Sequence, residues 1–193
     1  MPPPPPPAGF AWLAKLPTPQ AWTYLNQGTG GVYQVANALG TDDASPCIAL
    51  YVRCNQSDCY VAHVDSNVPS VRADIPAITA ATGARWQAVV QAHNIVISQQ
   101  YLSYFMVAGS GDPFFAQGFT AGIIAELGGV PVQPWTTLKE YNGFLYPSQA
   151  PAQSTPLLIP MSQTPANFNW QANKVAGADA WTLQKNAAGV ITF

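Results

Sequence analysis

Two apolar segments separated by a short polar loop form the clearest pattern in the chain. Residues 47–52 are apolar and partly β-branched, residues 55–58 (NQSD) are typical of a turn, and residues 59–64 are again apolar. This order predicts an antiparallel hairpin. Positions that sum to about 110 should pair across the loop. Cys47 and His63 are therefore expected at the same end of the two strands, side by side or one pair apart.

Two further segments have helical patterns. Residues 69–85 carry apolar positions at helical spacing, and Gly83 is a candidate for the end of that helix. Asp112 is a good N-cap, and Pro113 follows it in the first turn, so a second helix is expected to run from there through residue 127.

The remaining patterned segments favour strands. Residues 20–38 suggest a short helix followed by a strand near residues 32–35. Other strands are expected at residues 86–97 and 101–108, in several short pieces within 130–161, and in a hairpin at 180–193. This mixture predicts an α+β fold, a layered sandwich with a central, largely antiparallel β-sheet and flanking helices.

The length and the proline distribution suggest one domain with an N-terminal tail. A chain of 193 residues, nearly half of them apolar, is long enough for a single core. Six consecutive prolines, residues 2–7, favour an extended polyproline II stretch. We therefore expect a Pro-rich tail over residues 1–19 and a single domain over residues 20–193.

Charge narrows the classes of partner. Only 8% of the residues are charged, the formal net charge is −2, and the Lys and Arg residues are scattered singly. Nucleic-acid binding and polybasic membrane binding are disfavoured, because both need clustered positive charge. No apolar run approaches the roughly 18 residues of a membrane span. The N-terminal residues also lack the features of a signal peptide. We expect a cytoplasmic protein or, alternatively, a secreted or injected effector without a cleaved signal peptide.

The three cysteines do not indicate a structural disulfide or metal framework. Cys47, Cys54 and Cys59 are odd in number, and their spacing does not form paired Cys-x-x-Cys half-sites. Zinc binding by Cys54, Cys59 and His63 is the weaker alternative. We expect no metal and no other cofactor.

Cys47 and His63 are the candidates for nucleophilic chemistry. A thiol nucleophile needs a base that takes its proton and later protonates the leaving group. The hydroxyl of Thr41 is placed to hydrogen-bond the far imidazole nitrogen; Asp42, Asp43 or Asp65 are alternatives for that role. The competing interpretation is structural, because free cysteines are often buried in cores. His93, the second histidine, is interpreted as structural.

The segment GTDDASPCIALYV followed by AHVDS resembles the protein N-terminal asparagine amidohydrolases. A weaker similarity is the strand-like segment 104–109 before a helix, and the terminal hairpin also lies where that family ends. Thr-x5-Cys with a later His is likewise the arrangement of chemoreceptor glutamine deamidases and glutamine-deamidating toxins. The matched residues are Gly40, Thr41, Asp42, Asp43, Ala44 and Cys47, then His63 and Asp65.

The resemblance implies an α/β/β sandwich with a Cys-His-Thr triad formed by Cys47, His63 and Thr41. It implies conversion of a side-chain carboxamide of a protein or peptide substrate to a carboxylate through a thioester, with N-terminal asparagine as the expected substrate. Asp42, Asp43 and Asp65 are then candidates for binding the substrate's α-ammonium group. The alternatives are a glutamine deamidase acting on an internal residue, a non-catalytic binding module on the same fold and, less favoured, a cysteine peptidase.

Overall fold

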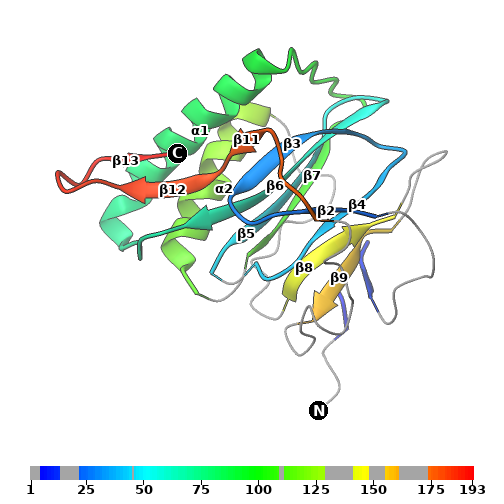
Figure 1. Cartoon of the computed structure of the whole chain (residues 1–193), viewed down its shortest axis with the longest axis horizontal. Helices are drawn as coiled ribbons and strands as arrows, with labels where there is room; N and C mark the ends of the chain where they lie inside the picture. The colour runs from blue at the N-terminus through cyan, green and yellow to red at the C-terminus, as the bar shows by residue number, and fades with distance from the viewer. Residues whose placement is uncertain are drawn as a thin grey trace.

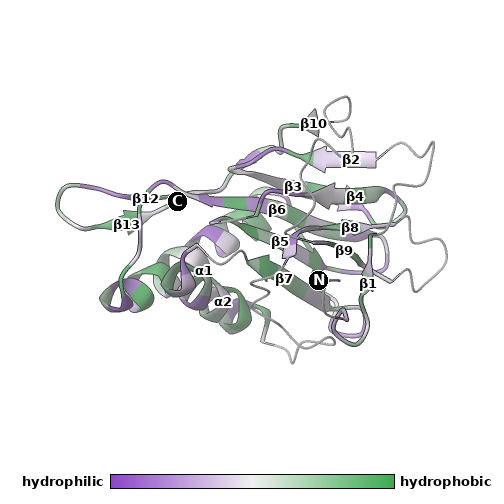
Figure 2. Cartoon of the chain, turned by 90° about the horizontal axis from the view of Figure 1, so that it is seen from below, coloured by the Kyte–Doolittle hydropathy of each residue, from purple (hydrophilic) through white to green (hydrophobic). Residues whose placement is uncertain are grey.

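The computed structural model describes residues 5–13, 22–44, 46–108, 111–128, 141–147, 155–160 and 174–193 (Figure 1). These residues form three layers: two helices, a central sheet and a second sheet. Figure 2 shows the helices together along one side of the molecule, away from strands β8 and β9. The predicted α+β sandwich is confirmed, with helices on one face of the central sheet only.

The central sheet is built around the predicted hairpin. Its neighbouring strands run antiparallel in the order β7, β5, β6, β3, β11, and β12 extends the sheet by pairing parallel to the end of β6 and antiparallel to β13. The strands are β3 (Thr29–Gln34), β5 (Ile48–Arg53), β6 (Asp58–Ser66), β7 (Ser103–Ala108), β11 (Asp179–Ala180), β12 (Thr182–Lys185) and β13 (Ile191–Thr192).

The hairpin of β5 and β6 is confirmed, with a register that matters for the site. Asn55 closes its turn, because Asn55 Oδ1 accepts hydrogen bonds from the backbone N–H groups of Ser57 and Asp58. Ile48 pairs with Val64, and the next pair joins Ala49 to His63. Each residue of β5 thus pairs with a β6 residue two positions further along the chain than expected.

The second sheet has mixed strand directions. Its order is β1, β9, β8, β4, β2, β10, with parallel pairing at β1–β9, β4–β2 and β2–β10 and antiparallel pairing elsewhere. Within the predicted N-terminal tail, β1 belongs to this sheet, and its neighbours Phe10 and Leu13 are buried. The strands are β1 (Ala11–Trp12), β2 (Trp22–Leu25), β4 (Ala38–Thr41), β8 (Tyr141–Tyr146), β9 (Leu157–Pro160) and β10 (Lys174–Val175).

Two helices cover the other face of the central sheet. They are α1 (Ile75–Ala92), which follows the short 3₁₀ helix η1 (Arg72–Asp74), and α2 (Pro113–Leu127). As predicted, the Asp112 carboxylate caps α2 by accepting from the N–H groups of Phe114 and Phe115, and Gly128 ends it in the left-handed conformation. Among the described residues, neither helix is both long and apolar enough to cross a membrane.

The expectations that fail concern the helix end at Gly83, the strand at residues 86–97 and the short helix before β3; residues 93–97 are in neither a helix nor a strand. Helix α1 continues through Gly83, so residues 86–92 are helical and not a strand. The reason is packing: the apolar side chains of Trp86 and Val89 recur at helical spacing and are buried against the central sheet. The short helix expected after residue 20 is instead strand β2, which pairs parallel to β4.

Alternation along β5 and β6 separates two cores. Ile48, Leu50 and Val52 point toward the helices, whereas Ala49 and Tyr51 point toward the second sheet. On β6, Cys59 and Val61 also face the second sheet. Since side chains alternate, His63 and Asp65 lie on this same face, which places the candidate chemistry between the two sheets and not under the helices.

Candidate active site

Thr41 and His63 are in direct contact. Thr41 Oγ1 lies 2.7 Å from His63 Nδ1 and 3.2 Å from the carbonyl oxygen of Leu25, and both side chains are buried. A carbonyl only accepts, so the hydroxyl proton is directed to Leu25 O, and the hydroxyl oxygen accepts from Nδ1–H. Only this assignment satisfies both hydrogen bonds. It leaves Nε2 of His63 as the basic nitrogen.

The contact between Thr41 and His63 joins the two sheets. Thr41 is the last residue of β4, and Leu25 is the last residue of the adjacent strand β2. His63 lies in the central sheet, flanked by Thr29 on β3 and Ala49 on β5. Both flanking side chains are small, which leaves room for the imidazole. Thr41 is in a strand whose pairing with its neighbours holds it in place.

The backbone of β8 approaches the Thr41–Asp42 peptide very closely. A Cβ atom built on Gly143 would lie 2.1 Å from Thr41 O and 2.6 Å from Asp42 Cα. The N–H of Ala44 also donates to the carbonyl of Asn142 at 2.8 Å. This packing leaves no space for a side chain at position 143 and restricts the position of Thr41.

Cys47 lies immediately before β5, level with Asp65 on β6. The Cys47 thiol donates to Asp65 Oδ1 at 3.1 Å, and Gln27 Nε2 donates to Cys47 Sγ at 3.5 Å. His63 is the preceding residue of β6 on the same face. Diagonal neighbours of this kind have Cα atoms about 7–8 Å apart and remain within reach of long side chains. The structure thus brings Cys47, Asp65 and His63 onto one surface of the hairpin.

The surroundings of Cys47 favour its protonated form. Burial is the largest cause that raises the pKa of the thiol, followed by its hydrogen bond to Asp65 and the negative charges of Asp65 and Asp43. The backbone N–H of Ser66 acts in the opposite direction. The resting group is therefore a thiol that must transfer its proton during a reaction.

The three acidic candidates have different environments. Asp65 is half-buried and in contact with Cys47, whereas Asp43 is exposed. The backbone of Asp43 has φ 58°, a left-handed conformation that Asp tolerates better than most residues. Asp42 is only 1% exposed and follows Thr41 into the sheet interface. Asp65 and Asp43 are therefore accessible to a ligand, whereas the side chain of Asp42 is buried.

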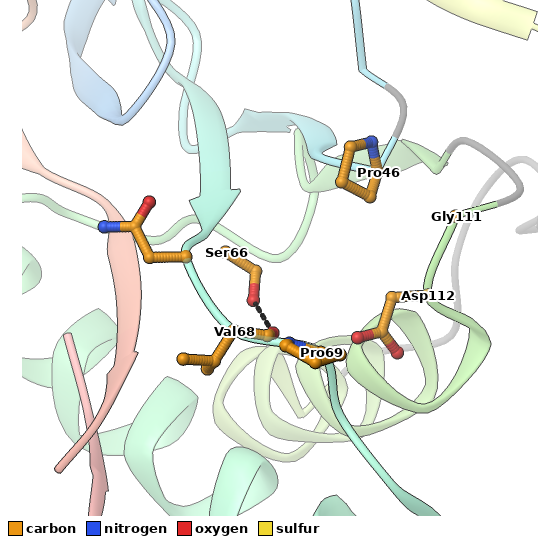
Figure 3. A pocket seen from close by; sticks show the side chains of 7 residues that line it. Pro46, Ser66, Val68, Pro69, Gly111 and Asp112 are labelled. Carbon is orange, nitrogen blue, oxygen red and sulfur yellow. Dashed lines mark hydrogen bonds between the residues drawn. The ribbon is translucent and has the colours of Figure 1, made fainter.

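A cavity of about 230 Å³ lies next to these residues (Figure 3). Two of its lining residues, Pro46 and Ser66, are chain neighbours of Cys47 and Asp65, whose own side chains do not line it. The Asp112 carboxylate at the start of α2 accepts from Ser70 N–H and stabilises the wall. The volume is smaller than the roughly 300–1,000 Å³ of drug-sized sites. The lining residues are Pro46, Ser66, Asn67, Val68, Pro69, Gly111 and Asp112.

Other reactive groups lie elsewhere. Cys54 and Cys59 are buried in the cores, and burial raises the pKa of the Cys54 thiol to about 12. His93 follows the end of α1, where its Nε2 lies 2.9 Å from Asp179 Oδ2, in a different part of the fold. Glu126 bonds Gln87 across the two helices. Within the described ranges, no group of three or more His, Cys, Asp or Glu residues is arranged to hold a metal ion.

Gln27 is the site residue that the sequence did not indicate. It lies in the turn between β2 and β3, before Gly28, whose φ of 71° requires a glycine-like conformation. The side chain is exposed apart from its contact with Cys47. A single polar residue in a turn carries no sequence signal for this role, because only the pairing of β3 with β6 brings it to the thiol.

No model of a known protein family matches this chain, and no curated protein matches it.

Proposed function

We propose that this protein is a cysteine amidohydrolase that converts the side-chain carboxamide of an N-terminal asparagine to a carboxylate. The observation that carries this proposal is the 2.7 Å contact of Thr41 with His63, which orients a basic Nε2 on the face that Cys47 shares. The resemblance of residues 40–65 to N-terminal asparagine amidohydrolases points to the same chemistry. The reaction consumes water and releases ammonia.

The first half of the reaction forms a thioester. His63 Nε2 removes the proton of Cys47, and Sγ attacks the carboxamide carbon. The negative oxygen of the tetrahedral intermediate accepts hydrogen bonds from the Cys47 N–H and from Gln27 Nε2, which already points to the sulfur at 3.5 Å. The imidazolium then donates its proton to the leaving nitrogen, the carbon–nitrogen bond breaks, and ammonia departs.

The second half of the reaction restores the thiol. Neutral His63 takes a proton from a water molecule, whose oxygen attacks the thioester carbon. The carbon–sulfur bond breaks, the side chain of the substrate becomes a carboxylic acid, and the sulfur regains its proton from His63. Thr41 stays hydrogen-bonded to Nδ1 throughout and stabilises the charged imidazolium, which transfers protons twice in each cycle.

The acidic residues near the thiol favour a substrate with a positive charge. Asp65 contacts Cys47, and the charge of Asp43 also acts on the thiol. An asparagine at the start of a chain carries an α-ammonium group close to its carboxamide. Binding of that group by the two carboxylates would position the carboxamide over Cys47, and the cavity lined by residues 66–69 would accept the following residue.

The test is a panel of peptides and proteins assayed for ammonia release and for the amide-to-acid mass change. The panel contains N-terminal Asn, N-terminal Gln, acetylated Asn, and internal Gln in a folded protein extract. Cys47→Ala is the negative variant, and Cys59→Ala, which removes a buried thiol away from the site, is its matched control.

The outcomes separate the possible functions. Conversion of N-terminal Asn that requires Cys47 supports the proposal. Conversion of internal Gln alone would assign a glutamine deamidase. Absence of conversion by the folded protein would contradict a deamidase and favour a binding module.

A further inference from the structure

We infer that Asp65 holds the Cys47 thiol in an unreactive position until a cationic amine of the substrate binds to this carboxylate. Recognition of the amine and activation of the nucleophile would then be one event. This inference rests on the proposed function and adds to it a reason why the enzyme would require a free amino group.

The geometry gives Asp65 control over the thiol proton. Asp65 Oδ1 accepts the thiol at 3.1 Å and also accepts the N–H of Ser66 at 2.8 Å, so the carboxylate is held in place from its own strand. His63, the base, is the preceding residue of β6 on the same face. A thiol that donates to Asp65 directs its proton away from His63 Nε2, and the transfer to the base cannot begin in this arrangement.

The charges around the thiol act in the same direction. The groups that face Cys47 are Gln27 from the β2–β3 turn, Asp43 from the segment after β4, and Asp65 and Ser66 N–H from β6. None of these described groups is a Lys or Arg. Two negative charges close to the sulfur disfavour a thiolate, and burial raises its pKa further.

An ammonium group would reverse both effects. It would pair with the half-buried Asp65 carboxylate through charge-assisted hydrogen bonds and compete with the thiol for that acceptor. The thiol would then be free to turn toward His63, and a positive charge beside the sulfur would lower its pKa. An acetylated N-terminus has no charge and would leave the restraint in place. Before substrate arrives, the protonated thiol is protected from alkylation and oxidation.

The first experiment measures alkylation of Cys47 by iodoacetamide at pH 8, followed by site-resolved mass spectrometry. Asp65→Asn keeps the shape of the side chain and removes its charge. We expect it to accelerate alkylation of Cys47 at least about tenfold, because one pKa unit changes the thiolate fraction tenfold. Asp58→Asn, at the other end of β6, is the matched control and should leave the rate unchanged. Cys54 and Cys59 serve as buried internal references. An Asp65→Asn rate equal to that of the unaltered protein overturns the inference.

The second experiment needs no substitution, so it decides the matter even if Asp65→Asn fails to fold. Iodoacetamide alkylation of the unaltered protein is measured with glycine methylamide and with acetylglycine methylamide. The free amine should accelerate alkylation of Cys47 several-fold, and the acetylated compound should not. A rate that does not rise with the free amine overturns the inference.

Alkylation and turnover are separate readouts. If N-terminal Asn is converted but the amine does not accelerate alkylation, the proposed function stands and the coupling through Asp65 fails. If both alkylation results are positive but no peptide is converted, the restraint on Cys47 is real and the assigned reaction is wrong.

Discussion

Thr41 Oγ1 lies 2.7 Å from His63 Nδ1, although the two residues belong to different sheets. The orientation and tautomer of the histidine therefore depend on how the second sheet packs against the central one. A change that moves β4 relative to β6 would alter the base without touching the hairpin that carries it.

Removal of Cys47 or His63 should abolish the proposed reaction. A general base contributes about 10²–10⁴ in rate, and loss of the nucleophile removes the covalent route altogether. We expect Cys47→Ala and His63→Ala to lower ammonia release by at least that factor, with an unchanged circular dichroism spectrum. Residual turnover of Cys47→Ala near the unaltered rate would exclude a cysteine mechanism.

Removal of the Thr41 hydroxyl should slow the reaction less. Thr41→Val keeps the shape and deletes the bond to His63. A hydrogen bond to a charged group is worth about 1.5–3 kcal/mol, which corresponds to a loss in kcat of about 10- to 150-fold. Thr41→Ser, which keeps the hydroxyl, should recover most of the activity. Equal kcat values for the Val and Ser variants would show that Thr41 does not orient the base.

The amide of Gln27 should contribute to the proposed oxyanion site. Loss of one such donor typically lowers kcat by about 10²–10³. We expect Gln27→Ala to reduce kcat by such a factor, with little change in KM. Gln56→Ala, in the turn at the far end of the hairpin, is the matched control. A change confined to KM would assign Gln27 to substrate binding and not to transition-state stabilisation.

A side chain at position 143 should damage both stability and the site. The Cβ of Gly143→Ala would overlap the backbone of Thr41 and Asp42, and overpacking typically costs about 1–3 kcal/mol. Urea denaturation measures this loss. Gly83→Ala is the control. It is helical, and its Cβ would meet a flexible carboxylate, Glu126 Oε1, at 3.1 Å, so it should be neutral or slightly stabilising. Similar urea midpoints for both variants would contradict the close approach of β8.

The free energy of unfolding should fall as the pH rises above about 9. Burial raises the pKa of Cys54 from 9.0 to about 12 and that of Tyr146 from 10.0 to about 12, and it also raises the pKa of Cys47, Cys59 and Tyr60. Between the unfolded and folded pKa values the unfolded chain has lost protons that the folded protein retains, so deprotonation favours unfolding. Urea midpoints at pH 7, 9 and 10.5 measure this decline. A midpoint that stays constant to pH 10.5 would show that these groups are not protected by the fold.

Local sequence patterns determined the elements that depend only on residues close to one another along the chain. The β5–β6 hairpin follows from two apolar runs around a turn stabilised by Asn55, and the start of α2 follows from Asp112 and Pro113. The sequence offered Thr41 as a partner of His63, with Asp42, Asp43 and Asp65 as alternatives, and the structure brings Thr41 and His63 together. The pattern at residues 86–92 allowed either a strand or a helix. The helix formed because its apolar side chains are buried against the central sheet.

Only the tertiary structure decided which atoms meet. The register of β5 and β6 aligns Cys47 with Asp65 rather than His63, and a shift of two residues is beyond the resolution of a sequence pattern. Gln27 reaches the thiol and Thr41 reaches His63 because strands distant along the chain pair and the two sheets pack together. These contacts arise from long-range packing, which no local stretch of sequence encodes.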